Sequence, residues 1–308
     1  MSRYIARRLL QMVATFIGTT FIVYALMFAY TNDPLQALAG ERPVTEAQRR
    51  VMTERYHLDE PFLVQYGYYM KGLVTGDFGQ SLTGREISEM LATAWPVTAK
   101  LALLAICFVI IFGVSGGVVA GLRRGGFFDT ASLGLTLIFI SVPIIVIAPL
   151  AQYLFGVKWH LFPITTGANP SFHALLLPAM VLGALSLATN MRLTRTSVAE
   201  NLRADYVRTA RAKGLSRRRV VGIHVVRNSM IPVVTSIGVD LGTLMGGAIV
   251  TEGVFNIPGV GFNLLRGIRT EDGPVVVGFV SVLVMVYLIT SLVVDLLYAV
   301  LDPRIRYE

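Results

Sequence analysis

Long apolar runs alternate with short charged loops along most of this chain. Six runs approach or exceed the roughly 20 apolar residues that an α-helix needs to cross the hydrocarbon core of a membrane. They are Leu9–Tyr30, Val97–Leu122, Ala131–Phe155, Ala174–Asn190, Met230–Thr251 and Val275–Val300. The fourth run is the weakest, because Asn190 and Arg192 end it early and Pro178 lies near its start. The pattern predicts an all-α integral membrane protein with six transmembrane helices.

Composition and charge support this assignment. Apolar residues make up 54% of the chain and charged residues 15%, which is outside the range of ordinary soluble domains. The net charge of +8 comes from Lys and Arg residues, many of which gather in the N-terminus, in alternate loops and in the tail. Because basic loops of this kind mark the cytoplasmic side, we expect a protein of the cell membrane with both termini in the cytoplasm. We also expect contact with membrane lipid and no nucleic-acid partner.

The spacing of the runs divides the chain into four parts. We expect a cytoplasmic start and first helix over 1–30, an extracytoplasmic helical segment over 31–96, a core of five transmembrane helices over 94–298 with a cytoplasmic loop at 191–229, and a cytoplasmic tail over 299–308. In the long outer segment, Val44–Arg55 and Phe62–Leu73 are rich in helix formers. Three prolines within the runs can kink or interrupt their helices: Pro143, Pro149 and Pro178.

A short basic helix is predicted in the 191–229 loop. Asp205 has the side chain of an N-cap, no helix breaker occurs from Tyr206 to Lys213, and Gly214 stands where a left-handed C-terminal cap belongs. Tyr206, Ala210 and Gly214 are four residues apart and share one face, so an aromatic side chain is followed by two positions that another backbone can approach. This face suits a groove on a partner protein. The alternative is a solvated basic helix with an ordinary glycine cap.

Several kinds of catalytic and metal site are missing from the sequence. No G-x-x-x-x-G-K-[ST] loop is present to hold nucleotide phosphates, so any ATP must be bound by another chain. H-E-x-x-H and C-x-x-C do not occur, and the four His residues lack the spacing of metal ligands. The single Cys107 excludes an intrachain disulfide. We therefore expect no catalytic residue, metal or cofactor on this chain.

Motifs along the whole chain resemble those of one transporter family. The run Tyr206-Val-Arg-Thr-Ala-Arg-Ala-Lys-Gly214-Leu, followed by Arg227-Asn-Ser-Met-Ile-Pro232, resembles the cytoplasmic loop of binding-protein-dependent ABC importer permeases of the dipeptide/oligopeptide/nickel type. Further stretches are similar to other signatures of that family: Gly76-Asp-Phe-Gly-Gln-Ser81, Leu244-Met-Gly-Gly247, Glu252-Gly-Val-Phe-Asn-Ile-Pro-Gly-Val-Gly261 and Leu301-Asp-Pro-Arg304. The resemblance is greatest to the first of the two permease subunits.

The loop departs from the general importer pattern of Glu-Ala-Ala, three residues, Gly, and a hydrophobic-Pro pair thirteen residues later. Here Arg208-Thr-Ala210 replaces Glu-Ala-Ala, Gly214 is retained, and Pro232 comes five residues later than in that pattern. We still expect this loop to dock on an ATPase, as the resemblance implies. We do not expect the ion pair that the missing Glu would make.

The resemblance implies a type I ABC importer permease fold and one half of a translocation pathway for dipeptides or short oligopeptides. A second homologous permease subunit would complete the pathway, two ATPase domains or subunits would hold ATP and Mg, and an extracytoplasmic solute-binding protein would deliver substrate. Coupling to the ATPases is expected at Tyr206, Thr209, Ala210, Arg211, Ala212, Lys213, Gly214 and Leu215. Nickel complexes, haem and other small solutes stay open as substrates.

Two carboxylates stand out within the expected spans. Asp240 lies mid-span with Ser236 and Thr243, and we expect these three residues in the substrate pathway, where Asp240 could meet a peptide's ammonium group. An Asp hydrogen-bonded to the partner subunit is the alternative. Asp295 lies near the inner end of the last span and is expected to be structural, paired with an Arg. An ion-coupled secondary transporter or channel, with Asp240 and Asp295 as ion sites, is the competing function.

Overall fold

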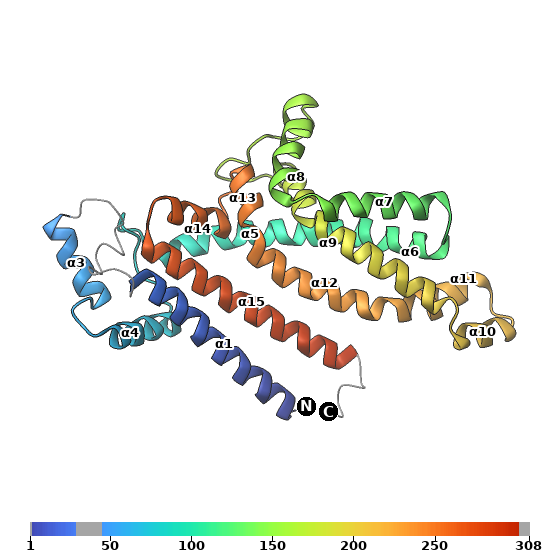
Figure 1. Cartoon of the computed structure of the whole chain (residues 1–308), viewed down its shortest axis with the longest axis horizontal. Coiled ribbons are helices and arrows are strands. Elements are labelled where there is room, and N and C mark those ends of the chain that lie inside the picture. Colours follow the sequence, from blue (N-terminus) through green and yellow to red (C-terminus); the bar gives the residue numbers. More distant parts are fainter. Residues whose placement is uncertain (1, 29–44, 302–308) are drawn as a thin grey trace.

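Every regular element is a helix in the residues that the computed structural model describes, 2–28 and 45–301 (Figure 1). The α-helices are α1 (Ser2–Phe28), α3 (Glu46–Tyr56), α4 (Phe62–Thr75), α5 (Ile87–Phe108), α6 (Ser115–Leu122), α7 (Phe127–Ser141), α8 (Ile144–Ala151), α9 (Phe172–Asn201), α10 (Asp205–Ala212), α11 (Arg217–Arg219), α12 (Arg227–Gly247), α13 (Ile249–Phe255), α14 (Val260–Arg269) and α15 (Gly273–Leu301). Three segments are π-helical: η1 (Val109–Val114) joins α5 to α6, η2 (Gln152–Lys158) continues α8, and η3 (Val220–Val226) joins α11 to α12. The predicted tail beyond residue 301 and the end of the first run after residue 28 lie outside the described residues.

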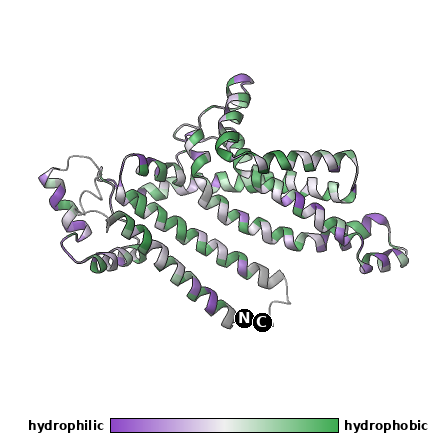
Figure 2. Ribbon diagram, in the orientation of Figure 1, coloured by the Kyte–Doolittle hydropathy of each residue, from purple (hydrophilic) through white to green (hydrophobic). Residues whose placement is uncertain are grey.

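Five continuous helical segments are long and apolar enough to cross a membrane. They are Ile5–Met27, Ile87–Leu122, Phe172–Asn201, Arg217–Gly246 and Gly273–Leu296. A sixth span is reached when Phe127–Ser141 and Ile144–Lys158 are counted together. The all-α membrane fold expected from the sequence is therefore confirmed. In Figure 2 the long helices are mostly hydrophobic, and hydrophilic residues gather at α3 and around α10 and α11.

The third expected span, Ala131–Phe155, is not one straight helix. The chain bends by 107° between Phe127–Ser141 and Ile144–Lys158. α7 ends at Ser141, Val142 is extended with φ −101° and ψ 122°, and Pro143 precedes the first residue of α8. Proline has no N–H and crowds the residue before it out of the helical region, so the chain turns at this point.

The fourth run, the weakest in the sequence, forms the centre of the bundle. α9 packs against α5, α6, α7 and α12, and 61% of its most apolar window is buried, the largest share among the five continuous candidates. The polar side chains that lower its hydropathy face other helices: Asn190 and Thr194 are fully buried, and Ser197 is 8% exposed. A membrane-spanning helix tolerates polar residues at these positions because they face protein and not lipid. Their presence is the reason that the hydropathy of α9 is low.

Glycines on α6 allow this close packing. A Cβ atom on Gly117 would lie 2.6 Å from the carbonyl oxygen of Met191, and one on Gly121 would lie 2.8 Å from that of Arg195. Both distances are too short for any other residue without movement of a backbone. α6 and α9 are therefore held at a separation that only glycine permits at these two positions.

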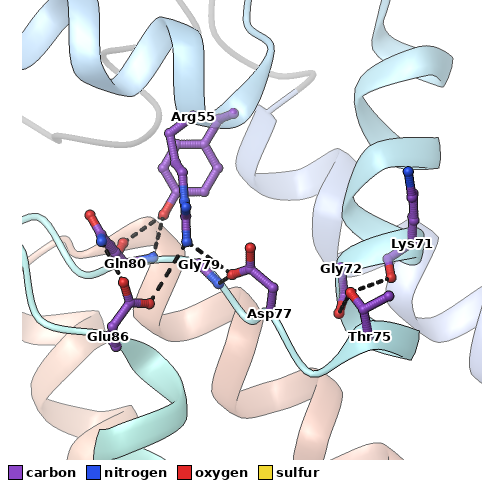
Figure 3. A network of polar contacts seen from close by, with 9 residues as sticks. Arg55, Lys71, Gly72, Thr75, Asp77, Gly79, Gln80 and Glu86 are labelled. Atoms are coloured by element: carbon purple, nitrogen blue, oxygen red, sulfur yellow. Dashed lines mark hydrogen bonds and ion pairs between the residues drawn. The ribbon is translucent and has the colours of Figure 1, made fainter.

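The helices α3 and α4 and the loop after them form a polar and aromatic layer beside the bundle. The helices α3 and α4 correspond to the two expected at Val44–Arg55 and Phe62–Leu73. The following loop is fixed by Arg55, whose guanidinium lies 3.1 Å from Asp77 (Figure 3). Tyr56 also holds it, because its hydroxyl donates to the Gln80 carbonyl at 2.6 Å. Tyr69 of α4 donates to or accepts from Ser281 of α15, which attaches this layer to the bundle.

Candidate coupling element and pathway

The predicted basic helix is present as α10, at the opposite end of the molecule from α3 and α4 (Figure 1). Gly214 has φ +74°, and its N–H donates to the Arg211 carbonyl at 2.9 Å, so the left-handed turn expected after the helix is confirmed. The expected N-cap is wrong by one residue. Ala204 is the extended residue before the helix, and the Asp205 side chain points to solvent, 3.7 Å from Arg208.

One face of α10 is buried in the protein's own core. Val207 is fully buried and Ala210 is 5% exposed, and both pack in a cluster with Val198 of α9 and with Val220 and Val225 of η3. Residues three apart lie on the same side of a helix, so Val207 and Ala210 form the inner face. The expectation that Ala210 presents itself to a partner is therefore wrong: spacing alone puts it on a face with Tyr206 but cannot tell which side of the helix is covered.

The rest of the surface of α10 is open. Tyr206, Thr209 and Lys213 are exposed, as are Arg211, Ala212 and Gly214. The Tyr206 hydroxyl donates to Oδ1 of Asn201, the last residue of α9. Leu215 is half-buried beside the Val207 cluster. Of the eight residues predicted to contact ATPases, the structure leaves six exposed and turns Ala210 and Leu215 inward.

Two buried serines join the helices on either side of α10. The Ser197 hydroxyl of α9 donates to the Ser229 carbonyl of α12 at 3.1 Å, and the Ser229 hydroxyl donates to the Ser197 carbonyl at 3.2 Å. Close by, the guanidinium of Arg195 makes two contacts with the carboxylate of Asp129 on α7, one of them at 2.8 Å. These contacts unite α7, α9, α10 and α12 into one block. The sequence showed the residues but not their pairing.

Asp240 has a partner within the chain. Asn190 Nδ2 of α9 donates to Asp240 Oδ2 of α12 at 2.5 Å, and the other amide atom, Oδ1, is buried without a hydrogen-bond partner among the described residues. Ser236 and Thr243 are four residues before and three after Asp240 and share its helix face. Thr243 is exposed and donates to the Val239 carbonyl at 3.1 Å. The pairing of Asp240 with Asn190 was not expected from the sequence.

The other carboxylate in a span, Asp295, is paired as expected. Its Oδ1 atom lies 3.1 Å from Nη2 of Arg8, which joins α15 to α1.

A third charged side chain inside an expected span, Lys100 of α5, was not among the charges singled out from the sequence. It is exposed and lines a cavity with residues of α14.

Glu252 organises the motif from 252 to 261. It is fully buried on α13, accepts from the Thr98 hydroxyl at 2.6 Å, and accepts from the Phe262 N–H at 2.9 Å. A Cβ atom on Gly259 would lie 2.4 Å from its Oε1 atom, so only glycine fits there. Burial raises the pKa of Glu252 to about 7 against the opposing effect of these hydrogen bonds and one from Gly261. The carboxyl thus holds the start of α14 against α5 and α13.

Metal ligands are not grouped in the described part of the chain. Within residues 2–28 and 45–301, no group of three or more His, Cys, Asp or Glu side chains is placed to hold a metal ion.

Comparison with known proteins agrees with the geometry. Residues 113–307 match the family of binding-protein-dependent transport system inner membrane components, and residues 1–85 match the N-terminal part of such components. The chain is 36% identical to the dipeptide transport system permease protein DppB of Escherichia coli (strain K12) and 38% identical to the di/tripeptide transport system permease protein DppB of Pseudomonas aeruginosa (strain UCBPP-PA14). It is 35% identical to the glutathione transport system permease protein GsiC of Escherichia coli (strain K12). All three alignments cover 100% of both chains. This chain therefore belongs to the family of binding-protein-dependent transport system inner membrane components, as a multi-pass membrane permease subunit.

Proposed function

We propose that this chain forms half of the translocation pathway of an ATP-driven importer and receives its driving motion through α10. The observation that carries the proposal is the division of α10 into two faces. Val207 and Ala210 attach the helix to α9 and η3, while Tyr206, Thr209 and Lys213 are left exposed. A helix anchored on one side and open on the other can pass a push from a partner into the bundle.

The contacts around α10 determine where such a push would go. α9 leads into α10, η3 continues into α12, and the reciprocal Ser197–Ser229 hydrogen bonds tie these two helices together. Closure of two ATPase domains against the exposed face would therefore move α9 and α12 together as a rigid body, with α7 attached through Asp129. Since the sequence has no phosphate-binding loop, ATP and Mg belong to those partner chains.

The charge distribution supports the orientation. Arg208, Arg211, Lys213 and the run Arg217–Arg219 all lie on or beside α10. Under the positive-inside rule this end faces the cytoplasm, where ATPases are available, and α3 and α4 face the opposite compartment, where a solute-binding protein delivers substrate. Both termini are then cytoplasmic.

The substrates proposed here are dipeptides and short oligopeptides. Two of the similar proteins are dipeptide or di/tripeptide permeases and a third is a glutathione permease, each aligned over its full length. A second homologous permease subunit completes the pathway. Ser236, Asp240 and Thr243 are proposed to face it, with the Asp240–Asn190 hydrogen bond setting the orientation of the carboxylate.

The test is a gentle-detergent purification of the tagged chain from native membranes, with mass spectrometry, ATPase assay and reconstituted uptake. We expect a second permease, ATPase subunits, and peptide uptake that requires ATP. Thr209→Trp should uncouple ATP hydrolysis from uptake because it enlarges the exposed face of α10. Lys158→Gln, on an exposed residue of η2, is the control. Recovery of the chain alone, with uptake driven by an ion gradient, would replace this proposal with an ion-coupled carrier.

A further inference from the structure

A cavity of about 690 Å³ lies between the beginning of α5, the loop before α9, and α14. Ligand pockets in proteins commonly have volumes of about 300–1,000 Å³. A sphere of this volume is about 11 Å across, close to the roughly 10 Å reach of three extended residues. The space therefore matches a dipeptide or tripeptide.

The cavity carries charge of one sign. Arg85, Lys100 and Arg266 line it, together with neutral polar residues such as Asn169 and Asn263, and no Asp or Glu is among its lining residues. None of the three cations makes an ion pair with another residue in the described parts of the chain. A cleft with positive walls concentrates anions from the surrounding solution.

Two carboxylates on elements that line the cavity or adjoin it, Asp272 and Glu252, are already engaged. Asp272 lines a smaller neighbouring pocket with Arg85 and Arg266, but its oxygens accept from the Ser81 hydroxyl at 2.9 Å and the Leu82 N–H at 3.1 Å. Glu252 is fully buried behind the wall, where it accepts from Phe262. Neither carboxylate is among the residues that line the cavity.

The position of Lys100 along α5 places the cavity near one membrane boundary. The 22 residues at 101–122 are all uncharged and rise about 33 Å, which matches the roughly 30 Å of the hydrocarbon core. Lys100 then lies at the end of the crossing away from Arg123, Arg124 and α10. An ammonium group at this depth is stabilised when it faces a space that water can enter, and Lys100 lines such a cavity.

The wall that carries Arg266 is held rigidly. Phe262, Asn263 and Arg266 belong to α14, whose first turn is fixed by the buried Glu252 carboxyl, and the Asn263 side chain donates to the Gly259 carbonyl at 2.8 Å. The backbone that carries Arg266 therefore does not need to be ordered when a ligand binds, and only its side chain loses freedom.

We propose that this cavity binds the terminal carboxylate of a short peptide during its passage, through Lys100 and Arg266 with Arg85 at the rim. The inference rests on the proposed peptide import and assigns to it a site on this chain. Phe262 supplies an apolar wall for the peptide's side chains, so selection in the cavity depends on the carboxylate and not on the identity of those side chains.

The test uses the complex purified with this chain, in lipid nanodiscs and without the binding protein. Equilibrium dialysis measures the binding of radiolabelled dialanine and of dialanine amide, which has no carboxylate. Wild type should prefer dialanine, and the double variant Lys100→Gln, Arg266→Gln should bind it about tenfold or more weakly, since each charged hydrogen bond contributes about that factor. Arg269→Gln is the matched control, because Arg269 is exposed on the same helix but does not line the cavity.

The possible results separate this inference from the function on which it rests. Unchanged dialanine binding in the double variant, or equal binding of dialanine and its amide by wild type, would overturn it. An equal loss in Arg269→Gln would do the same, because general positive charge would then explain the binding. The charge-retaining pair Lys100→Arg, Arg266→Lys should keep most of the binding, and unchanged ATPase activity shows that the variants assemble. Reconstituted uptake is measured separately, and a wild-type complex that imports no peptide would overturn the proposed function and this inference with it.

Discussion

Val207→Ala should loosen α10 without altering the surface it offers to a partner. Val207 is fully buried in the cluster that holds α10 to α9 and η3. The substitution removes two methyl-sized groups, each contributing about 0.8 kcal/mol, and leaves a small cavity, so the attachment should weaken by about 2 kcal/mol. Opening of α10 should then become about 30-fold more frequent.

Hydrogen exchange measures this opening directly, through the backbone amides of residues 205–215 in the purified complex without ATP. Their exchange should accelerate by up to about 30-fold in Val207→Ala, and uptake per ATP hydrolysed should fall. Thr209→Ala is the matched control, because Thr209 is an exposed residue of the same helix and its change should leave exchange nearly constant. Wild-type exchange in Val207→Ala would show that the buried cluster does not hold α10, and α10 could not then pass motion to the bundle through that cluster.

The other predictions concern the bundle and its buried carboxyls. Gly117→Val should sharply reduce the yield of folded protein on size-exclusion chromatography because of the clash with Met191, whereas Gly134→Ala, with open space around it, should not; equal yields would refute the close packing. Asp240→Asn should alter peptide uptake while the complex stays assembled if Asp240 faces the pathway, and loss of the complex on purification would make it structural. The pKa of the Glu252 carboxyl is about 7 in the folded protein and 4.5 in the unfolded chain. The protonated carboxyl therefore stabilises the fold fully below pH 4.5, and this contribution, at most about 3 kcal/mol, is lost as the pH rises through 7. Glu252→Gln should remove that part of the pH dependence of the melting temperature, and an unchanged profile would contradict the assignment.

Much of the helical architecture could be predicted from the sequence. Apolar runs of span length predict a membrane bundle because the hydrocarbon core leaves few other structures possible for such segments. The basic helix and its left-handed turn could also be predicted, since Gly214 is the residue that such a turn favours. The pairing of Asp295 with an arginine followed from the cost of an isolated charge in a span.

The remaining features depend on tertiary contacts that spacing does not show. Ala210 turned out to face inward because Val198, Val220 and Val225 cover that side of α10. Asp240 is bonded to Asn190, fifty residues away in sequence. Lys100 becomes notable only when the fold brings Arg266 to the same cavity. In each case, local pattern identified a residue type or a helix, while the partner came from another segment.

The chain bends by 107° between α7 and α8. Whether this bent segment crosses the membrane decides on which side every later helix emerges. With residues 127–158 counted as one crossing, α9 returns the chain to the side on which it began, and α10 emerges on the same side of the membrane as the start of α1. If that segment dipped into the bilayer and came back, α9 would run the other way and α10 would emerge in the opposite compartment, away from any ATP. Pro143 thus affects more than the shape of a single span: the compartment reached by the coupling helix depends on a complete crossing through this broken segment.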